Sequence, residues 1–414
     1  MRLRLSNDVS VATQWRPALL IGNALLLAAL WALLSGPTPA LAQTTSFDLS
    51  SLYRNDIRAL GMGNSYVAVA RSEGALQYNP AGLVQAQNDI KLEGSLLVAG
   101  SSLAFIDDTV ALVSGSVTQA AADDYLNTYA DTTQRYSGQT YYSALAGMGA
   151  LNFGLGYGSQ DIFQYSLGFS SGALANDTSD DVITWDAGTL SIQYLSGGFA
   201  IRDGQMLLGA TSKSFRYVTE TASVTAADLV LVGLNESDLV GSTYVGTALD
   251  VGFIYRIESL ARLRGQWALN VLNVGGVEIT SGASTLSIPM SINFGMSISP
   301  ELPLGELLLH FELEDIDSKV LVDTPGGTDQ KARSVIQRSH YGVEYGLFDT
   351  AFGSHILNLR AGYNRGLVTY GAEINVFSGF RIAVAQYRDD LGNDSANSYT
   401  DPIIAFQASV GFAF

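Results

Sequence analysis

Two carboxylates separated by one residue, Glu312 and Glu314, are the first candidates for chemistry in the sequence. On a strand such residues lie on one face about 6.8 Å apart, a spacing that suits acid–base work by a carboxylate pair. The same pairs are common where charged side chains line a water-filled barrel. No H-E-x-x-H or G-x-S-x-G motif accompanies them. We therefore expect a structural pair in a protein that is not an enzyme.

Metal and cofactor sites are also not predicted. The three histidines, His310, His340 and His355, have no ligand spacing, and the chain has no cysteine. Aspartates near 123–124 and 177–181 do not match the spacing of an EF-hand loop. The Gly61-Met62-Gly63 run lacks the preceding strand and the third glycine of a dinucleotide fingerprint.

The elements that would position Glu312 and Glu314 are strands with one polar face. Between 305 and 316, leucines and Phe311 alternate with histidine and glutamate, and the same two-residue period recurs along the chain from residue 90. One face meets lipid or a core and the other meets water. The polar face is predicted to carry Arg256, Arg262, Arg264, His310, Glu312, Glu314, Glu344, Arg360, Glu373 and Arg381. We interpret these residues as a ladder of ion pairs in a lumen, with a polar ligand site as the alternative.

Connector lengths indicate a membrane barrel. Long polar connectors near 120–139, 168–186, 220–242, 276–284, 319–334 and 390–401 alternate with short ones, as external loops alternate with periplasmic turns in outer-membrane barrels. Fifteen runs look like strands, but a closed single-chain barrel needs an even number. One of the first two runs, 91–105 or 109–117, must then belong to a broken strand or to the segment before the barrel. The sequence predicts a transmembrane antiparallel β-barrel of about 14 strands spanning 90–414.

The segment before the barrel has a different character. It contains two compact pieces joined by a bend at 71–74, with glycines at positions that need close backbone approach and an Asn-Pro turn that can begin a helix. We expect this stretch to lie inside the barrel as a hatch within a domain of residues 43–89. The residues assigned to the hatch motif are Gly61, Met62, Gly63, Asn64, Tyr78, Asn79, Pro80, Ala81 and Gly82.

The two halves of this stretch, A-L-G-M-G-N-x-Y-V-A-V-A and A-L-x-Y-N-P-A-G-L, resemble the N-terminal hatch of the outer-membrane long-chain fatty acid transporter (FadL) family. They also resemble related barrel subunits of the PorV type, which serve a protein secretion system. The resemblance covers about 26 residues and implies a barrel that admits hydrophobic small molecules. The ligand-contacting residues of the family lie outside the motif, so none is assigned here.

The N-terminus is typical of an export signal. Residues 1–42 combine three arginines, an apolar run and an Ala-Leu-Ala cleavage site, so we expect the mature chain to begin at Gln43 and to reach the bacterial outer membrane. Removing this segment changes the net charge from −17 to −19. Such an acidic chain is not expected to bind nucleic acid.

The C-terminus carries its own alternating strand. Apolar residues occupy every second position from Ile404 to the terminal Phe414. This pattern resembles the C-terminal signal read by the barrel assembly machinery, which is therefore an expected partner along with outer-membrane lipids.

Two functions remain open. The first is passive, porin-like uptake of hydrophobic molecules such as long-chain fatty acids, with a hydrophobic ligand, detergent or lipid as partner. The alternative is a PorV-like scaffold or shuttle subunit of a secretion or surface-attachment system, with the loops at 177–186 and 219–242 as docking surface. An apolar pocket against the hatch would favour transport, and a lumen that is polar throughout would not.

Overall fold

The computed structural model describes residues 54–85, 90–101, 128, 133–148, 152–169, 182–225, 240–282, 284–302, 305–318, 321–323, 330–349, 355–377, 379–388 and 402–413. The expected signal segment 1–42, the run 109–117, both aspartate clusters and Phe414 lie outside these residues. Among the described residues, no helix is long and apolar enough to cross a membrane.

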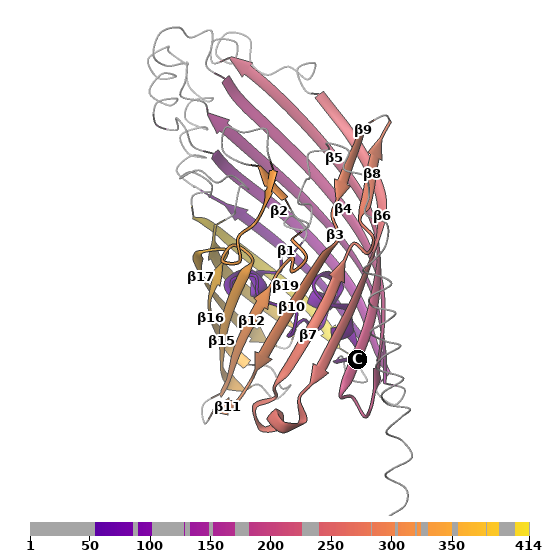
Figure 1. Cartoon of the computed structure of the whole chain (residues 1–414). Helices are drawn as coiled ribbons and strands as arrows, with labels where there is room; N and C mark the ends of the chain where they lie inside the picture. The colour runs from indigo at the N-terminus through magenta and orange to yellow at the C-terminus, as the bar shows by residue number, and fades with distance from the viewer. Residues whose placement is uncertain are drawn as a thin grey trace, which may run out of the picture. The chain divides into compact units, whose positions relative to one another are not determined.

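A closed antiparallel barrel of 14 wall strands dominates the described part of the chain. Figure 1 shows these strands side by side around the barrel. The wall strands are β1 (Ile90–Gly100), β2 (Thr133–Met148), β3 (Phe153–Phe169), β4 (Val182–Ile201), β5 (Met206–Thr225), β6 (Val240–Arg256), β7 (Gln266–Leu272), β10 (Ser291–Ile298), β12 (Gly305–Leu313), β15 (Ser339–Asp349), β16 (His355–Asn364), β17 (Leu367–Phe377), β18 (Phe380–Tyr387) and β19 (Ile403–Ala413). β1 pairs with β19 from Lys91↔Ala413 to Gly100↔Ile404 and closes the ring. The predicted strand number is confirmed. Of the two candidate runs for the first strand, 91–105 and 109–117, β1 lies in the first.

Five short strands accompany the wall strands in the described part of the chain. β8 (Val277–Ser281) and β9 (Ser284–Ile288) form a hairpin between β7 and β10, and β8 also touches β6 at Val245↔Thr280. β11 (Glu301–Leu302) pairs with β12, and β13 (Leu321–Asp323) with β14 (Gln330–Ala332) makes a separate hairpin.

The strands differ in length around the ring. β2 to β6 contain 16–20 residues, whereas β15 to β19 contain 8–11. Sequence reasoning placed loops at 168–186 and 220–242, but β4 begins at Val182 and β5 continues to Thr225. The Ser/Thr-rich ends of these strands were read as loops because they lack apolar alternation. Their backbones nevertheless pair, since hydrogen bonding along a ladder does not require an apolar face.

The predicted two-residue period is confirmed in the strands. Leu309, Tyr341, Val343, Tyr370 and Ile374 are exposed on the outside, as are Phe406 and Phe412 of the last strand. The lumen-side neighbours Glu312, Glu344 and Glu373 are buried. A continuous outer surface of exposed aliphatic and aromatic side chains is the surface that a bilayer covers.

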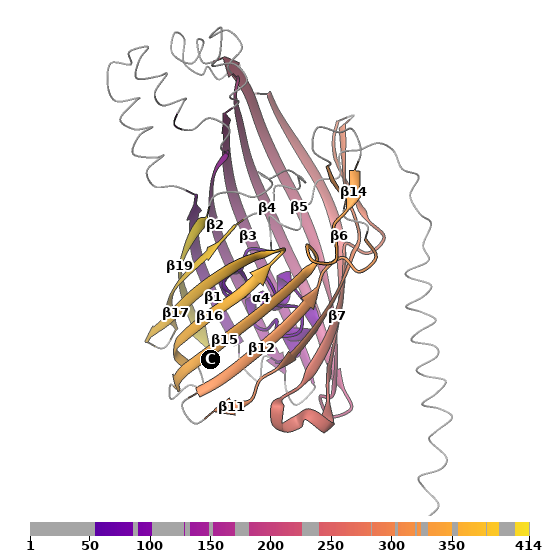
Figure 2. The ribbon, with the colours of Figure 1, turned by 60° about the vertical axis from the view of Figure 1, so that its left-hand side comes forward.

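Residues Arg54–Gln85, here called the inner segment, lie inside the ring of strands (Figure 2). Helix α3 (Ile57–Gly61) packs on β16 to β19, whereas the 3-10 helix η1 (Pro80–Gln85) packs on β2 to β6, on another part of the wall. The short helix α4 (Glu73–Gln77) lies between them in sequence. The segment is buried almost throughout, with Ala59, Met62, Val67 and Tyr78 at 0% exposure.

Local sequence signals explain the turns of the inner segment. Asp56 Oδ1 caps α3 by accepting hydrogen bonds from Arg58 N at 2.8 Å and Ala59 N at 3.2 Å. Asn79 Oδ1 accepts from Ala81 N at 3.1 Å, and Pro80 occupies the first position of η1, where a missing N–H is harmless. The bend before α4 places Ser72 at φ 54°, so this bend is held by its surroundings.

Candidate functional site: the lumen and the inner segment

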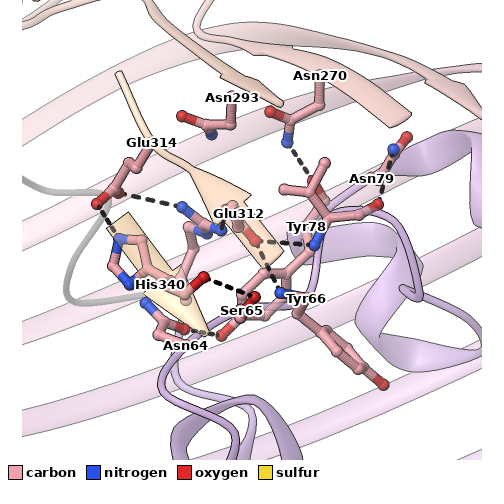
Figure 3. Close-up of polar contacts among 12 residues, drawn as sticks. Asn64, Ser65, Tyr66, Tyr78, Asn79, Asn270, Asn293, Glu312, Glu314 and His340 are labelled. Atoms are coloured by element: carbon pink, nitrogen blue, oxygen red, sulfur yellow. Dashed lines mark hydrogen bonds and ion pairs between the residues drawn. The ribbon is translucent and has the colours of Figure 1, made fainter. Parts of the chain in front are cut away.

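Glu312 is the hub of the contact between the inner segment and β12. Its Oε2 accepts hydrogen bonds from the backbone N–H groups of Tyr66 at 2.7 Å and Val67 at 3.0 Å (Figure 3). Its Oε1 pairs with Arg54 Nη2 at 2.8 Å, and Arg54 Nη1 reaches Glu314 Oε1 at 3.2 Å. Burial alone lowers the pKa of Arg54, but Glu312 and Glu314 outweigh burial and raise it above its ordinary value. Arg54 is therefore held as a buried cation.

Two histidines extend this network. Ala68 N donates to His310 Nε2 at 3.1 Å, so Nε2 is an acceptor and Nδ1, which contacts Ser65 Oγ, carries the ring proton. His340 Nδ1 lies 3.0 Å from the Gly63 carbonyl, and its Nε2 lies 3.1 Å from Glu314 Oε2 (Figure 3). Each ring nitrogen of His340 therefore faces an oxygen, one on the inner segment and one just after β12. Arg365 adds a further ion pair to Glu314 at 2.8 Å.

A second group of ion pairs holds α3. Arg58 makes a bidentate contact with Glu344, from Nε to Oε2 at 2.8 Å and from Nη2 to Oε1 at 2.7 Å. Arg360 bridges Glu344 at 2.5 Å and Glu373 at 2.9 Å. Arg381 pairs with Glu73 of α4 at 3.1 Å and with Glu93 of β1. The charges of inner segment and wall thus compensate one another inside the barrel.

The structure brings together most of the polar residues proposed from sequence, but not all. His310, Glu312, Glu314, Glu344, Arg360, Glu373 and Arg381 belong to the networks above. Arg262 and Arg264 do not lie on a strand, which corrects their predicted position: they fall in and just after the 3-10 turn η5 (Glu258–Leu263) and are exposed. β7 begins only at Gln266 because Arg264, in the left-handed conformation at φ 46°, ends that turn. Arg256 lies at the end of β6 and lines the cavity described below.

The Asn-Pro turn is fixed to the wall by amide side chains. Asn79 Nδ2 donates to Val67 O at 3.0 Å and to Phe253 O of β6 at 3.4 Å. Asn270 of β7 donates to the Tyr78 carbonyl from the other side (Figure 3). The turn thereby satisfies its buried backbone groups with lumen amides.

Glycines of the wall strands lie in direct contact with the backbone of both halves of the hatch motif, and we call these contact positions seats. A Cβ on Gly209 would lie 2.5 Å from Ala81 N, a Cβ on Gly252 would lie 2.9 Å from Pro80 Cδ, and a Cβ on Gly154 would lie 2.8 Å from Leu83 O. On other strands a Cβ on Gly342 would lie 2.7 Å from Met62 O, and one on Gly362 would overlap Gly63. Real Cβ atoms do not approach that closely, so only glycine, which has no side chain, fits at the wall positions that the inner segment touches.

Sequence reasoning missed these seats, along with Arg54 and Arg365. Neither arginine is among the lumen residues that the sequence predicts. A signal for the seats was present, because glycine inside a strand commonly marks close approach of another backbone. The sequence gives no indication of which strand glycine faces which hatch residue.

One part of the lumen beyond the inner segment is apolar. Inward side chains of β2 to β6 and of the β8–β9 hairpin pack together with the inner segment to form the apolar cluster, whose buried members are Ala75, Leu76, Leu83, Tyr141, Leu145, Ile162, Leu190, Ile192, Tyr194, Phe215, Ala248, Val277, Ile279 and Ile288. Three members, Ala75, Leu76 and Leu83, come from the inner segment itself. The inner segment is therefore part of the apolar cluster.

A buried polar layer lies beside the apolar cluster. Lys213 Nζ pairs with Asp250 Oδ2 at 2.8 Å and donates to Asn273 Oδ1 at 3.1 Å, and both charged side chains are at most 1% exposed. Tyr194 OH donates to Gln160 Oε1 at 2.5 Å, and Ser196 and Thr211 share a hydrogen bond of 2.6 Å. The charges are compensated, so this layer offers no free ion to a ligand.

No protein-family model matches the chain, and no curated protein matches it. Solved structures do. The toluene transporter TodX of Pseudomonas putida gives a TM-score of 0.50 at 12% identity, covering 90% of this chain and 99% of that one. The toluene transporter TbuX of Ralstonia pickettii gives 0.51 at 12% identity, covering 87% and 98%. A deltaS2S3 mutant of the TodX monoaromatic hydrocarbon channel gives 0.51 at 13% identity, covering 87% and 98%.

At such low identity these likenesses concern the fold alone. The ring of 14 strands, the outer apolar surface and the agreement along nearly the whole length of each solved chain all describe one architecture. The resemblance noted from the hatch motif is thereby confirmed at that level: this chain has the fold of the long-chain fatty acid transporter (FadL) family of outer-membrane barrels.

Proposed function

We propose that this protein is an outer-membrane channel for the passive uptake of hydrophobic small molecules, with the inner segment as its hatch. The observation that carries the proposal is the apolar cluster, which packs against Ala75, Leu76 and Leu83 of the inner segment. A lumen that only conducted water and ions would be polar there. An apolar lumen instead lowers the free energy of an apolar solute that leaves water.

The chemistry of the cluster favours cargo without a free charge at this depth. Lys213 is already neutralised by Asp250, and the other polar groups nearby pair with one another. Monoaromatic hydrocarbons, named for the matching channels, and long-chain fatty acids, implied by the hatch motif, are the two cargo classes to compare. Because Lys213 is paired with Asp250 and cannot bind a carboxylate, we propose that neutral hydrocarbons are transported better than fatty acids.

The inner segment has the properties that a movable hatch needs. It is held by ion pairs and hydrogen bonds to the wall, such as Arg58–Glu344, Arg54–Glu312 and Glu73–Arg381. Water or neighbouring charges can replace such contacts when the segment shifts, whereas a single apolar core could not re-form elsewhere. Cargo in the apolar cluster would act directly on α4 and η1.

The apolar cluster can be tested by placing one amide in it. Ile192 on β4 is fully buried in the cluster, whereas its neighbour Gln193 is exposed on the outer face. Ile192→Asn would bury an unpaired amide at a cost of about 1–3 kcal/mol, so toluene and oleate uptake should fall at least about fivefold. Gln193→Asn is the matched control on the same strand and should leave uptake unchanged.

Uptake is measured as radiolabelled solute entering cells that have the barrel as their only hydrocarbon channel, with the folded band on gels as a check of assembly. Equal uptake by both folded variants would remove the main support for a transport role. Co-purification of a secreted protein with a barrel that carries no solute would then favour the alternative, a PorV-like scaffold or shuttle of a secretion system.

A further inference from the structure

A cavity of about 750 Å³ lies at the end of the barrel that the short connectors close. Its lining comes from the β4–β5 turn, the β6–β7 connection, the ends of β10 and β12, and the bend of the inner segment at Arg71. It shares no lining residue with the apolar cluster. The transport role proposed above makes no use of it.

The cavity is unusually basic for this chain. Five of the 22 lysines and arginines of the whole sequence line it: Arg58, Arg71, Arg202, Arg256 and Arg264. Four acids line it as well: Asp203, Glu258, Glu306 and Glu344. The lining therefore carries one net positive charge in a protein whose net charge is −17.

Two of the four acids on this lining, Glu344 and Glu306, already form ion pairs. Glu344 is engaged by Arg58 and Arg360, and Glu306 pairs with Arg264 at 3.0 Å and lies 3.8 Å from His355. Asp203 and Glu258 are exposed in the connectors.

Three arginines on the lining take no part in these ion pairs. Within the described residues, Arg71, Arg202 and Arg256 have no carboxylate at ion-pair distance. They come from the inner segment, the β4–β5 turn and the end of β6. Each of these three elements therefore places on the lining one exposed guanidinium that has no carboxylate of the described residues at ion-pair distance.

Arg71 shows the electrostatic consequence. The nearby Arg58 guanidinium lowers the pKa of Arg71. Two guanidiniums in one cavity repel each other, and the repulsion is relieved when an anion lies between or beside them. Arg256 extends to the β4–β5 turn, where its Nη1 lies 3.5 Å from the position of a Cβ on Gly204. An anion near that turn would be within the reach of long, flexible arginine side chains.

We propose that this cavity is a binding site for a small oxyanion, a carboxylate or phosphate group, held by Arg71, Arg256 and Arg202. Guanidinium groups bind both oxyanions in a bidentate manner, and such charge-assisted hydrogen bonds are the stronger kind. The volume admits a multiply charged organic anion as well as inorganic phosphate.

Binding there reaches the inner segment through Arg71. Arg71 precedes Ser72, which has φ 54°, and α4 begins at Glu73. An anion that holds Arg71 therefore fixes the bend from which α4 starts. A ligand that binds only this arrangement stabilises it in proportion to its occupancy.

The test titrates inorganic phosphate and citrate into the full-length barrel in detergent by calorimetry, at constant ionic strength kept with sodium chloride. Arg71→Gln and Arg256→Gln each remove one guanidinium from the cavity. Arg216→Gln is the control, because Arg216 is exposed on the outer face of β5 and its loss changes the net charge equally. Each variant is first shown to be folded by its heat-modifiable band.

We expect saturable binding of at least one of the two anions to the unaltered protein and to Arg216→Gln. Binding should be at least tenfold weaker in Arg71→Gln and Arg256→Gln. No saturable binding of either anion, or equal binding by all the variants, would overturn the proposal. These titrations contain no apolar solute, so their result is independent of the transport role.

Discussion

At the scale of residues, each carboxylate that holds the inner segment accepts several donors at once. Glu312 receives two backbone N–H groups and a guanidinium, and Glu344 receives two guanidiniums. Arg54 and Glu312 are nearly completely buried, since their side chains are at most 1% exposed. Removing one partner of such a pair leaves a buried charge without compensation, which costs about 3–5 kcal/mol.

Glu312→Gln should therefore loosen the inner segment without unfolding the barrel. The amide cannot compensate Arg54, and its NH2 donor must face either the Arg54 guanidinium or the donors Tyr66 N and Val67 N, whichever way the amide turns. We expect the Tyr66 and Val67 amides to exchange with deuterium at least a hundredfold faster, in line with a loss of about 3 kcal/mol. Glu278→Gln on the exposed face of β8 is the control. Unchanged exchange at 66 and 67 would show that the Glu312 contacts do not hold the segment.

At the scale of elements, the wall and the inner segment fit through glycine. The Asn-Pro turn packs on Gly209 and Gly252, and the Gly61-Met62-Gly63 run packs on Gly342 and Gly362. The seats lie on β5, β6, β15 and β16, so the inner segment is located by several parts of the ring. Small residues at matched positions let two backbones touch, and apolar side chains pack around these contacts, as Val67, Ala68 and Ala81 do with Leu207, Ile254 and Ala268.

Gly252→Ala is expected to unseat η1. The new Cβ would lie 2.9 Å from Pro80 Cδ and would meet Asn79 Oδ1, and overpacking of this kind costs about 1–3 kcal/mol. Gly197→Ala on β4 is the matched control, because its Cβ would meet only Leu155 Cδ2 at 3.7 Å, an ordinary contact. Limited proteolysis of the folded barrels should cut between 58 and 85 several times faster in Gly252→Ala. If the two variants resist the protease equally, the glycine seat is not what holds the turn.

At the scale of the whole molecule, the strands of the barrel wall could be predicted from the sequence, but the contacts of the inner segment with that wall could not. Alternation is a local property, so the faces of β12 and β15 and the strand number could be predicted. The contacts of the inner segment join residues far apart in the sequence, such as Arg54 with Glu312, 258 positions away, and no local pattern encodes such a pairing. Arg262 and Arg264 were misplaced for a related reason: alternation continued through them, but a left-handed residue ended it.

The barrel and its inner segment are expected to be separable. The wall closes on itself through β1 and β19 and satisfies its own backbone ladder, whereas the inner segment depends on the wall for its partners. Deletion of residues 58–83 would leave Glu312, Glu344 and Arg360 facing the lumen, where entering water can hydrate them. The deleted protein should thus still show a heat-modifiable folded band, and its conductance in planar bilayers should rise severalfold over that of the full-length chain. Small polar solutes should leak through it, because the segment that fills the lumen between β2–β6 and β16–β19 is gone. A folded deletion variant that conducts no more than the full-length protein would mean that the inner segment does not close the channel, and the hatch assignment would fall with it.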